Sequence, residues 1–174
     1  PDDPEILLEL AWTHYYLNDP RKTLGLLLAL DAPIHRKYIA PERFLLEALA
    51  LRQLCQFGAA RHAAVRLRKK YDAALRELAE GALPEDIDQL VAAARLRGRT
   101  RANTMFKRQL EHEHHLVVDM AGQFGPQLAA KLKNLYERAL VEAGRRERRL
   151  IDHDLQDLTE ELLAAEEGVR LIVH

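Results

Sequence analysis

A cluster of histidines and acidic residues is the part of this sequence whose side chains are best suited to chemistry. The stretch QLEHEHHLVVDM, residues 109–120, holds three histidines and two glutamates within five positions. On a helix, His112, His115 and Asp119 would share one face, because they are three and then four residues apart. Two imidazoles and a carboxylate are ligands that zinc and iron accept, so this face is a candidate metal site.

The candidate metal site has no evident closing ligand. Protein zinc sites hold the ion with three or four side chains arranged around it. His153 and Asp154 are the distant residues of similar character, and the HExxH spacing of zinc proteases does not occur. Leu110 and Val117 give the helix an apolar face beside the histidines. We therefore expect solvated polar side chains and no metal or cofactor, with a helical metal-binding protein as the alternative.

Cys55 is the only cysteine, and hence the only possible thiol nucleophile. A single cysteine excludes a disulfide framework. A catalytic thiol needs a base and an oxyanion donor close by. Cys55 instead falls at an expected helix end, just before Phe57, where a small helix-end residue is the simpler interpretation. The sequence therefore predicts no catalytic residue and a protein that is not an enzyme.

Two basic runs could contact phosphates. RHAAVRLRKKY spans residues 61–71 and RLRGRTR spans residues 95–101. The chain as a whole has a net charge of −1, so there is no global field to attract nucleic acid. Cations near helix C-termini also stabilise the helix macrodipole. We expect solvated faces, and we keep a nucleic-acid-binding helical domain that uses residues 61–70 and 95–101 as a second alternative.

Helices must position all of these residues, because strand signals are almost absent and Leu, Ala, Glu, Arg and Gln fill long stretches. Pro4, Pro41, Pro84 and Pro126 stand where helices would start. No apolar run is long enough to span a bilayer. The pattern predicts an all-α protein with helices at about 4–17, 20–30, 41–55, 58–80, 84–97, 100–122 and from 126 onward.

Both ends of the sequence suggest a piece of a longer protein. The chain opens with PDDP, without an initiator Met or signal peptide, and closes with RLIVH inside an apolar repeat. Its 26 − 7 = 19 arginines and its many alanines are typical of a GC-rich bacterial genome. We expect the chain to be a soluble part of a larger bacterial protein or assembly. The sequence does not distinguish a cytoplasmic from a periplasmic location.

An internal repeat relates two segments of the first half. LAWTHYYLNDPRKTLGLLLAL (10–30) aligns with EALALRQLCQFGAARHAAVRL (47–67) at an offset of 48 − 11 = 37 residues. Small residues at Ala11 and Thr23, and at Ala48 and Ala60, would let paired helices approach each other. Large residues would then fill the space between the helices: Leu17, Leu27, Leu30, Leu54, Phe57 and Leu67.

On these residues, the chain resembles the tetratricopeptide repeat (TPR) family over about residues 4–72. The resemblance implies antiparallel helical hairpins in a right-handed superhelix fragment, in a TPR-like region at 1–82. The Trp-Leu-Gly-Tyr signature is mostly absent, and the family's closing Pro falls at His35 and Asp72. A generic antiparallel helical bundle is the alternative. Residues 83–174 are expected to form an extension of long helices.

The resemblance also implies a concave groove that binds a peptide or helix of another protein. Amphipathic aromatic residues and Arg are common in interface hot spots. Trp12 and Tyr16 could alternatively be core residues packed against a preceding element outside this sequence. Carried over by the alignment, the groove positions are Leu8, Trp12, Tyr15, Tyr16, Leu45, Leu49, Arg52 and Gln53.

The C-terminal helix carries a heptad stripe that needs a partner helix. A similar stripe begins upstream at Leu128, Leu132, Leu135 and Ala139. Each could pack on the helix at 100–122, on a second copy or on another protein. We therefore predict a non-enzymatic protein-interaction or scaffold domain with a coiled-coil-like seam. The seam residues are Ile151, Leu155, Leu158, Leu162, Ala165, Val169 and Ile172.

Overall fold

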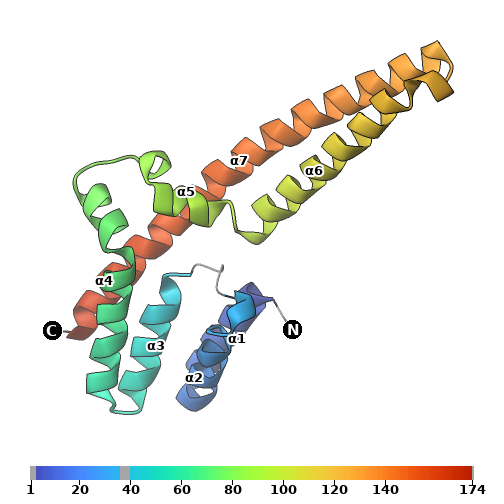
Figure 1. Ribbon diagram of the computed structural model, residues 1–174. Coiled ribbons are helices and arrows are strands. Elements are labelled where there is room, and N and C mark those ends of the chain that lie inside the picture. The colour runs from blue at the N-terminus through green and yellow to red at the C-terminus, as the bar shows by residue number, and fades with distance from the viewer. Residues whose placement is uncertain (1–2, 36–39, 174) are drawn as a thin grey trace. The chain divides into compact units, whose positions relative to one another are not determined.

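The computed structural model describes residues 3–35 and 40–173, and every regular element in these ranges is helical (Figure 1). The all-α prediction is thereby confirmed. None of the described helices combines the length and apolar character needed to cross a membrane. The helices are α1 (Pro4–Tyr16), α2 (Pro20–Ala29), α3 (Glu42–Gln53), α4 (Phe57–Ala79), α5 (Asp88–Ala94), α6 (Gly98–Asp119) and α7 (Pro126–Val173), with 3-10 turns at Pro33–His35, Pro84–Asp86 and Ala121–Gln123.

Local capping explains where the first helices begin. The carboxylate of Asp3 accepts the backbone N–H of Glu5 at 3.0 Å, ahead of α1. Asp19 likewise accepts the backbone N–H of Lys22 at 3.2 Å, ahead of α2. Each helix then opens on a proline, whose missing N–H has no helical partner to lose.

The chain groups into two compact units. Unit 1 comprises Pro1–Ala93 with Leu155–His174, and unit 2 comprises Ala94–Asp154. The division into regions 1–82 and 83–174 stays a prediction. Helix α7 contributes its first part to unit 2 and its last part to unit 1.

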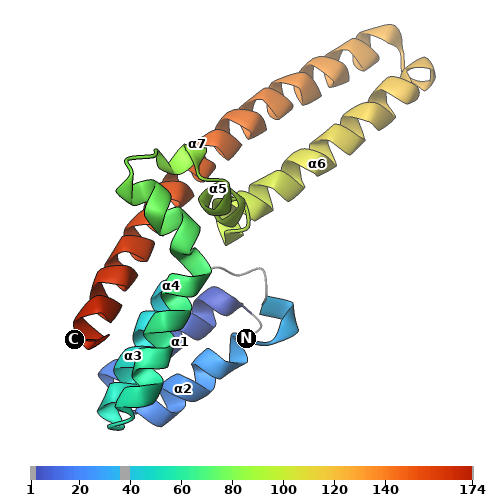
Figure 2. The ribbon, with the colours of Figure 1, turned by 60° about the vertical axis from the view of Figure 1, so that its left-hand side comes forward.

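Unit 1 contains two helical hairpins, α1 with α2 and α3 with α4 (Figure 2). The small residues of the sequence repeat lie at their contacts. Ala11, Thr23, Ala48 and Ala60 are all buried, and Thr23 Oγ1 donates to the carbonyl oxygen of Ala11 at 3.3 Å. A small residue on each helix allows this close approach.

The six large residues that were expected to fill the space between the helices have different environments, and Leu54 is partly buried. Leu27, Leu30 and Leu67 are buried, as predicted. The prediction was wrong for Leu17 and Phe57, whose exposed fractions are 68% and 63%. These two residues lie at the turns that join the helices, where their side chains have no facing helix to pack against.

The C-terminal part of α7 belongs to the core of unit 1. Leu158, Leu162 and Val169 are fully buried. Ile172 packs on a cluster of buried residues from α3 and α4 that includes Ala48 and Ala60. The chain's own N-terminal helices therefore cover this part of the heptad stripe.

Unit 2 is an antiparallel hairpin of α6 and the first part of α7, which lie side by side in both views (Figures 1 and 2). Polar contacts join its two helices. Asn103 Nδ2 donates to the carbonyl oxygen of Ala143 at 3.1 Å, and Lys107 Nζ pairs with Glu147 at 2.8 Å. The α6 residues that face α7 follow a heptad and are all at least partly buried: Thr100, Asn103, Lys107, Leu110, His114 and Val117.

Candidate functional site

Three aromatic rings cluster on α1. Trp12 stacks on Tyr16 with a centroid distance of 5.8 Å and an interplanar angle of 24°. Tyr15 meets both rings edge-on, at 5.9 Å from Trp12 and 5.7 Å from Tyr16. These rings face one another because residues three and four apart share a helix face.

The cluster is anchored at one side and exposed at the other. Trp12 is half-buried against the core formed by α1, α2 and α3, and its Nε1 donates to Glu42 Oε2 at 3.2 Å. Tyr16 is 77% exposed. A rigid, hydrogen-bonded indole thus supports an exposed tyrosine, which is the arrangement that interface hot spots favour.

The remaining groove positions have different environments. Leu8 is buried, so it contributes to the core. Leu45 and Leu49 are partly buried, whereas Arg52 and Gln53 are exposed. The Leu45 side chain lies so close to Gly168 that a Cβ there would be 2.6 Å from Leu45 Cδ1. At this position, α7 occupies the α3 surface that the resemblance assigned to a partner.

The histidine face of α6 stays open to solvent. His112, His115 and Asp119 are exposed. Asp154 does not approach them, because its carboxylate accepts the hydroxyl of Thr100. Thr100 is 12 residues from His112, which is about 18 Å along a helix. The geometry therefore supplies no closing ligand from Asp154 for the candidate metal face.

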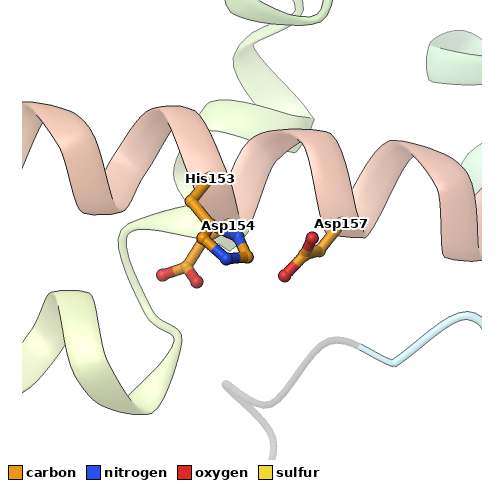
Figure 3. A group of neighbouring side chains, drawn as sticks. All are labelled: His153, Asp154 and Asp157. Atoms are coloured by element: carbon orange, nitrogen blue, oxygen red, sulfur yellow. The ribbon is translucent and has the colours of Figure 1, made fainter.

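A different set of possible ligands lies on α7 itself (Figure 3). Ligand atoms of His153, Asp154 and Asp157 all lie within 4.8 Å of one another, and the side chains leave the same side of the helix. This proximity follows from helical spacing, because Asp157 is four positions from His153 and three from Asp154. His153 and Asp157 have further interactions within the protein, and Asp154 is held by Thr100. These three side chains therefore form a local polar network.

His114 is partly buried in the hairpin, and it was not among the metal ligands considered from the sequence. It lies 6.4 Å from Tyr136, measured between ring centroids, and its Nε2 is buried without a hydrogen-bond partner. Tyr136 donates its hydroxyl to Glu113 at 3.0 Å, and this hydrogen bond raises the pKa of Tyr136. The heptad spacing from Thr100 to Val117 could have identified His114 as a residue that faces α7.

The basic run at 61–70 is engaged within unit 1. Arg66 pairs with Glu47, and Arg68 pairs with Glu166 at 3.0 Å. Lys70 lies over the rings of Phe44 and Tyr71, at 5.6 and 5.5 Å from their centroids. Burial, followed by the charge of Arg43, lowers the pKa of Lys70. These contacts give Arg66, Arg68 and Lys70 a structural role in unit 1.

The basic run at 95–101 has a second arginine-rich segment beside it in unit 2. The antiparallel pairing of Asn103 with Ala143 brings residues 95–101 to the same end of the hairpin as residues 145–149. A hollow of about 320 Å³ lies at this end. It is lined by Arg99, Ala102, Asn103 and Phe106 of α6 and by Arg146 and Leu150 of α7.

The sequence and the structure were also compared with known proteins. No family model matches the sequence, no curated protein matches it, and no solved structure matches the chain.

Proposed function

We propose that the chain is a non-enzymatic protein-interaction module, and that the aromatic cluster of α1 binds a peptide or helix of a partner protein. The observation that carries the proposal is Tyr16, which is 77% exposed and stacks on a half-buried Trp12. Ordering Tyr16 on binding has a small entropy cost, because its ring is already supported by two neighbouring rings. Exposed, pre-organised tyrosines contribute disproportionately to protein interfaces.

The TPR-like arrangement remains part of this proposal. Its support is the 37-residue offset, at which the two hairpins bury corresponding small residues, Ala11 with Ala48 and Thr23 with Ala60. In such an array, the partner would contact α1 at the open side of the first hairpin. The α3 positions Leu45 and Leu49 would serve the protein's own fold instead, because α7 packs there.

Selection of peptides on the intact chain tests the proposal. A displayed library of short random peptides would be panned on the protein, and binding would be followed by fluorescence. Trp12 is the only tryptophan, so its emission reports directly on this surface. We expect selected peptides to change that emission. Tyr16→Ala should weaken them about tenfold or more.

Phe57→Ala is the matched control, because Phe57 is an exposed aromatic residue of the same unit, at the turn between α3 and α4. It should leave the affinity unchanged. Selected peptides that bind equally well to Tyr16→Ala, or a library that returns no binders, would overturn the assignment of this surface.

A further inference from the structure

The hairpin of unit 2 leaves many large apolar side chains exposed. All of residues 94–154 are described, and the only apolar residues buried in this range are Ala94 and Ala143. Large apolar side chains elsewhere in the hairpin are exposed, and monomeric proteins seldom leave such surfaces uncovered without a binding role. They are Leu96, Met105, Phe106, Leu116, Val118, Met120, Leu128, Leu135 and Val141.

Several of these side chains lie along one flank of the hairpin. On α6, Phe106 lines the hollow directly. Met120 is the first residue after α6 and is 120 − 102 = 18 residues from Ala102, which is five helical turns. Met120 therefore lies close to the helical line that passes through Ala102, which lines the hollow. Phe106 and Met120 are 56% and 40% exposed.

The facing helix continues the same flank. Leu128 is 146 − 128 = 18 residues from Arg146, again five turns, and Leu135 is 146 − 135 = 11 residues away, which is close to three turns. Leu128 and Leu135 are 51% and 61% exposed. The flank from Arg99 to Met120 spans about 32 Å, which is enough for a helix of about 20 residues.

Positive charge is concentrated at one end of this flank. Arg99 and Arg146 border the hollow at the end where the two arginine-rich segments meet, whereas Met120, Leu128 and Leu135 lie toward the α6–α7 turn. Unit 2 as a whole has 13 basic and 8 acidic residues, a net charge of 13 − 8 = +5. A ligand that is apolar along one face and carboxylate-rich at one end would match both features.

We infer that this flank binds an amphipathic helix of another protein, with its carboxylates beside Arg99 and Arg146 and its apolar face on Phe106, Met120, Leu128 and Leu135. The bound helix would complete a three-helix bundle, which buries the apolar side chains that two helices leave exposed. Arginine suits the charged end, because its planar guanidinium pairs with carboxylates in two-point hydrogen bonds. This surface lies in unit 2, so the inference is independent of the α1 aromatic cluster.

The observations favour a partner protein over two other occupants. The acidic C-terminal part of α7 could not dock from a second copy through its heptad stripe, because Leu158, Leu162 and Val169 are fully buried in unit 1. A nucleic acid would use the arginines but would leave Phe106 and Leu135 without a role.

A designed peptide tests the inference on the full chain. The probe is a helical peptide of about 21 residues, with leucines at its heptad a and d positions and glutamates beside them in its last two turns. The matched probe has lysines in place of the glutamates. We expect the glutamate peptide to bind at least about tenfold more tightly than the lysine peptide, with an affinity that falls as salt is added.

Variants locate the binding to this flank. Phe106→Ala and Arg146→Glu should each weaken the glutamate peptide about tenfold or more. Met105→Ala should not, although Met105 is adjacent in sequence and is 62% exposed. The double variant R99E/R146E should prefer the lysine peptide, a gain that misfolding could not produce. Circular dichroism should show unchanged helix content in every variant.

Four outcomes would overturn the inference. The two peptides could bind equally well, or Met105→Ala could weaken binding as much as Phe106→Ala. A generic DNA duplex could bind the chain and displace the peptide, with an affinity that Phe106→Ala leaves unchanged, which would assign the arginines to nucleic acid. Sedimentation could show a dimer that Phe106→Ala dissociates, which would assign the flank to a second copy.

Discussion

Asn18 and Cys55 lie 37 residues apart and adopt the same left-handed backbone conformation, with φ angles of 59° and 58°. Each follows the last turn of a helix, and the backbone hydrogen bonds around them correspond. Asn18 N–H donates to Tyr15 O and Asp19 N–H to His14 O, as Cys55 N–H donates to Arg52 O and Gln56 N–H to Leu51 O. These bonds form the Schellman motif at both helix ends. The sequence repeat is therefore also a repeat of turn geometry.

Cys55→Gly should stabilise the protein, because a left-handed conformation is unfavourable for a residue with a Cβ. The end of α4 uses Gly81 at the corresponding position, with φ at 88°. We expect the free energy of unfolding to rise by about 1 kcal/mol in a urea titration followed by circular dichroism. Cys55→Ala keeps the Cβ and should give no gain. Equal effects of the two substitutions would contradict this explanation.

Gly168 should be coupled to Leu45. Alanine is favoured over glycine inside a helix by about 1 kcal/mol, but a Cβ at residue 168 would be 2.6 Å from Leu45 Cδ1. Gly168→Ala should therefore be more favourable by about 1 kcal/mol in a Leu45→Ala background than in the unsubstituted chain, as measured by a double-mutant cycle. Gly144→Ala is the control, because no atom lies within 4 Å of its Cβ position. Additive effects of the substitutions at 45 and 168 would disprove the contact.

Glu147 should make hairpin stability depend on pH. Hydrogen bonds from Lys107, at 2.8 Å, and from Thr104, at 2.7 Å, hold the pKa of Glu147 below its ordinary value of 4.5. Because the pKa is lowered in the folded state, the stabilisation is present above the ordinary value and is lost as pH falls through the lowered one.

The measurement is the thermal midpoint between about pH 6 and about pH 3, in the natural chain and in Glu147→Gln. The variant should lose less stability on acidification than the natural chain does. Glu137→Gln is the control, because Glu137 has only a long, exposed ion pair with Lys133, at 3.9 Å. An unchanged pH dependence in Glu147→Gln would remove Glu147 from the explanation.

His114→Leu should stabilise the hairpin. Its buried Nε2 has no hydrogen-bond partner, and the residue lies in the heptad that faces α7. Replacing an unsatisfied buried polar group with an apolar one should raise the stability by about 1 kcal/mol. The readout is hydrogen exchange of the α6 amides. His115→Leu, at an exposed position, should have little effect, and a loss of protection in His114→Leu would show that the imidazole is needed.

Much of the helical architecture could be predicted because its determinants are local. Prolines and capping aspartates define where α1 and α2 begin, and the expected ranges 4–17 and 20–30 agree with Pro4–Tyr16 and Pro20–Ala29 within a residue. The expected helix at 84–97 is the exception. A 3-10 turn at Pro84–Asp86 precedes the short α5, with Ile87 buried between them.

The candidate sites could be predicted less well, because each depends on contacts between distant residues. Helical spacing placed His112, His115 and Asp119 on one face, but the register of the hairpin decides that Asp154 meets Thr100 and not His112. The same register brings Arg146 and Arg99 to one hollow, which neither arginine-rich segment indicates alone.

The heptad stripe of α7 shows which property the local pattern determines and which the tertiary structure decides. Its period predicts that Leu158, Leu162 and Val169 are covered, and they are fully buried. The period contains no information about the covering surface, because any apolar helix face offers a similar gain in burial. In the fold, α3 and α4 pack on Ile172, and Leu45 of α3 lies against Gly168, although 123 positions separate this pair in the chain.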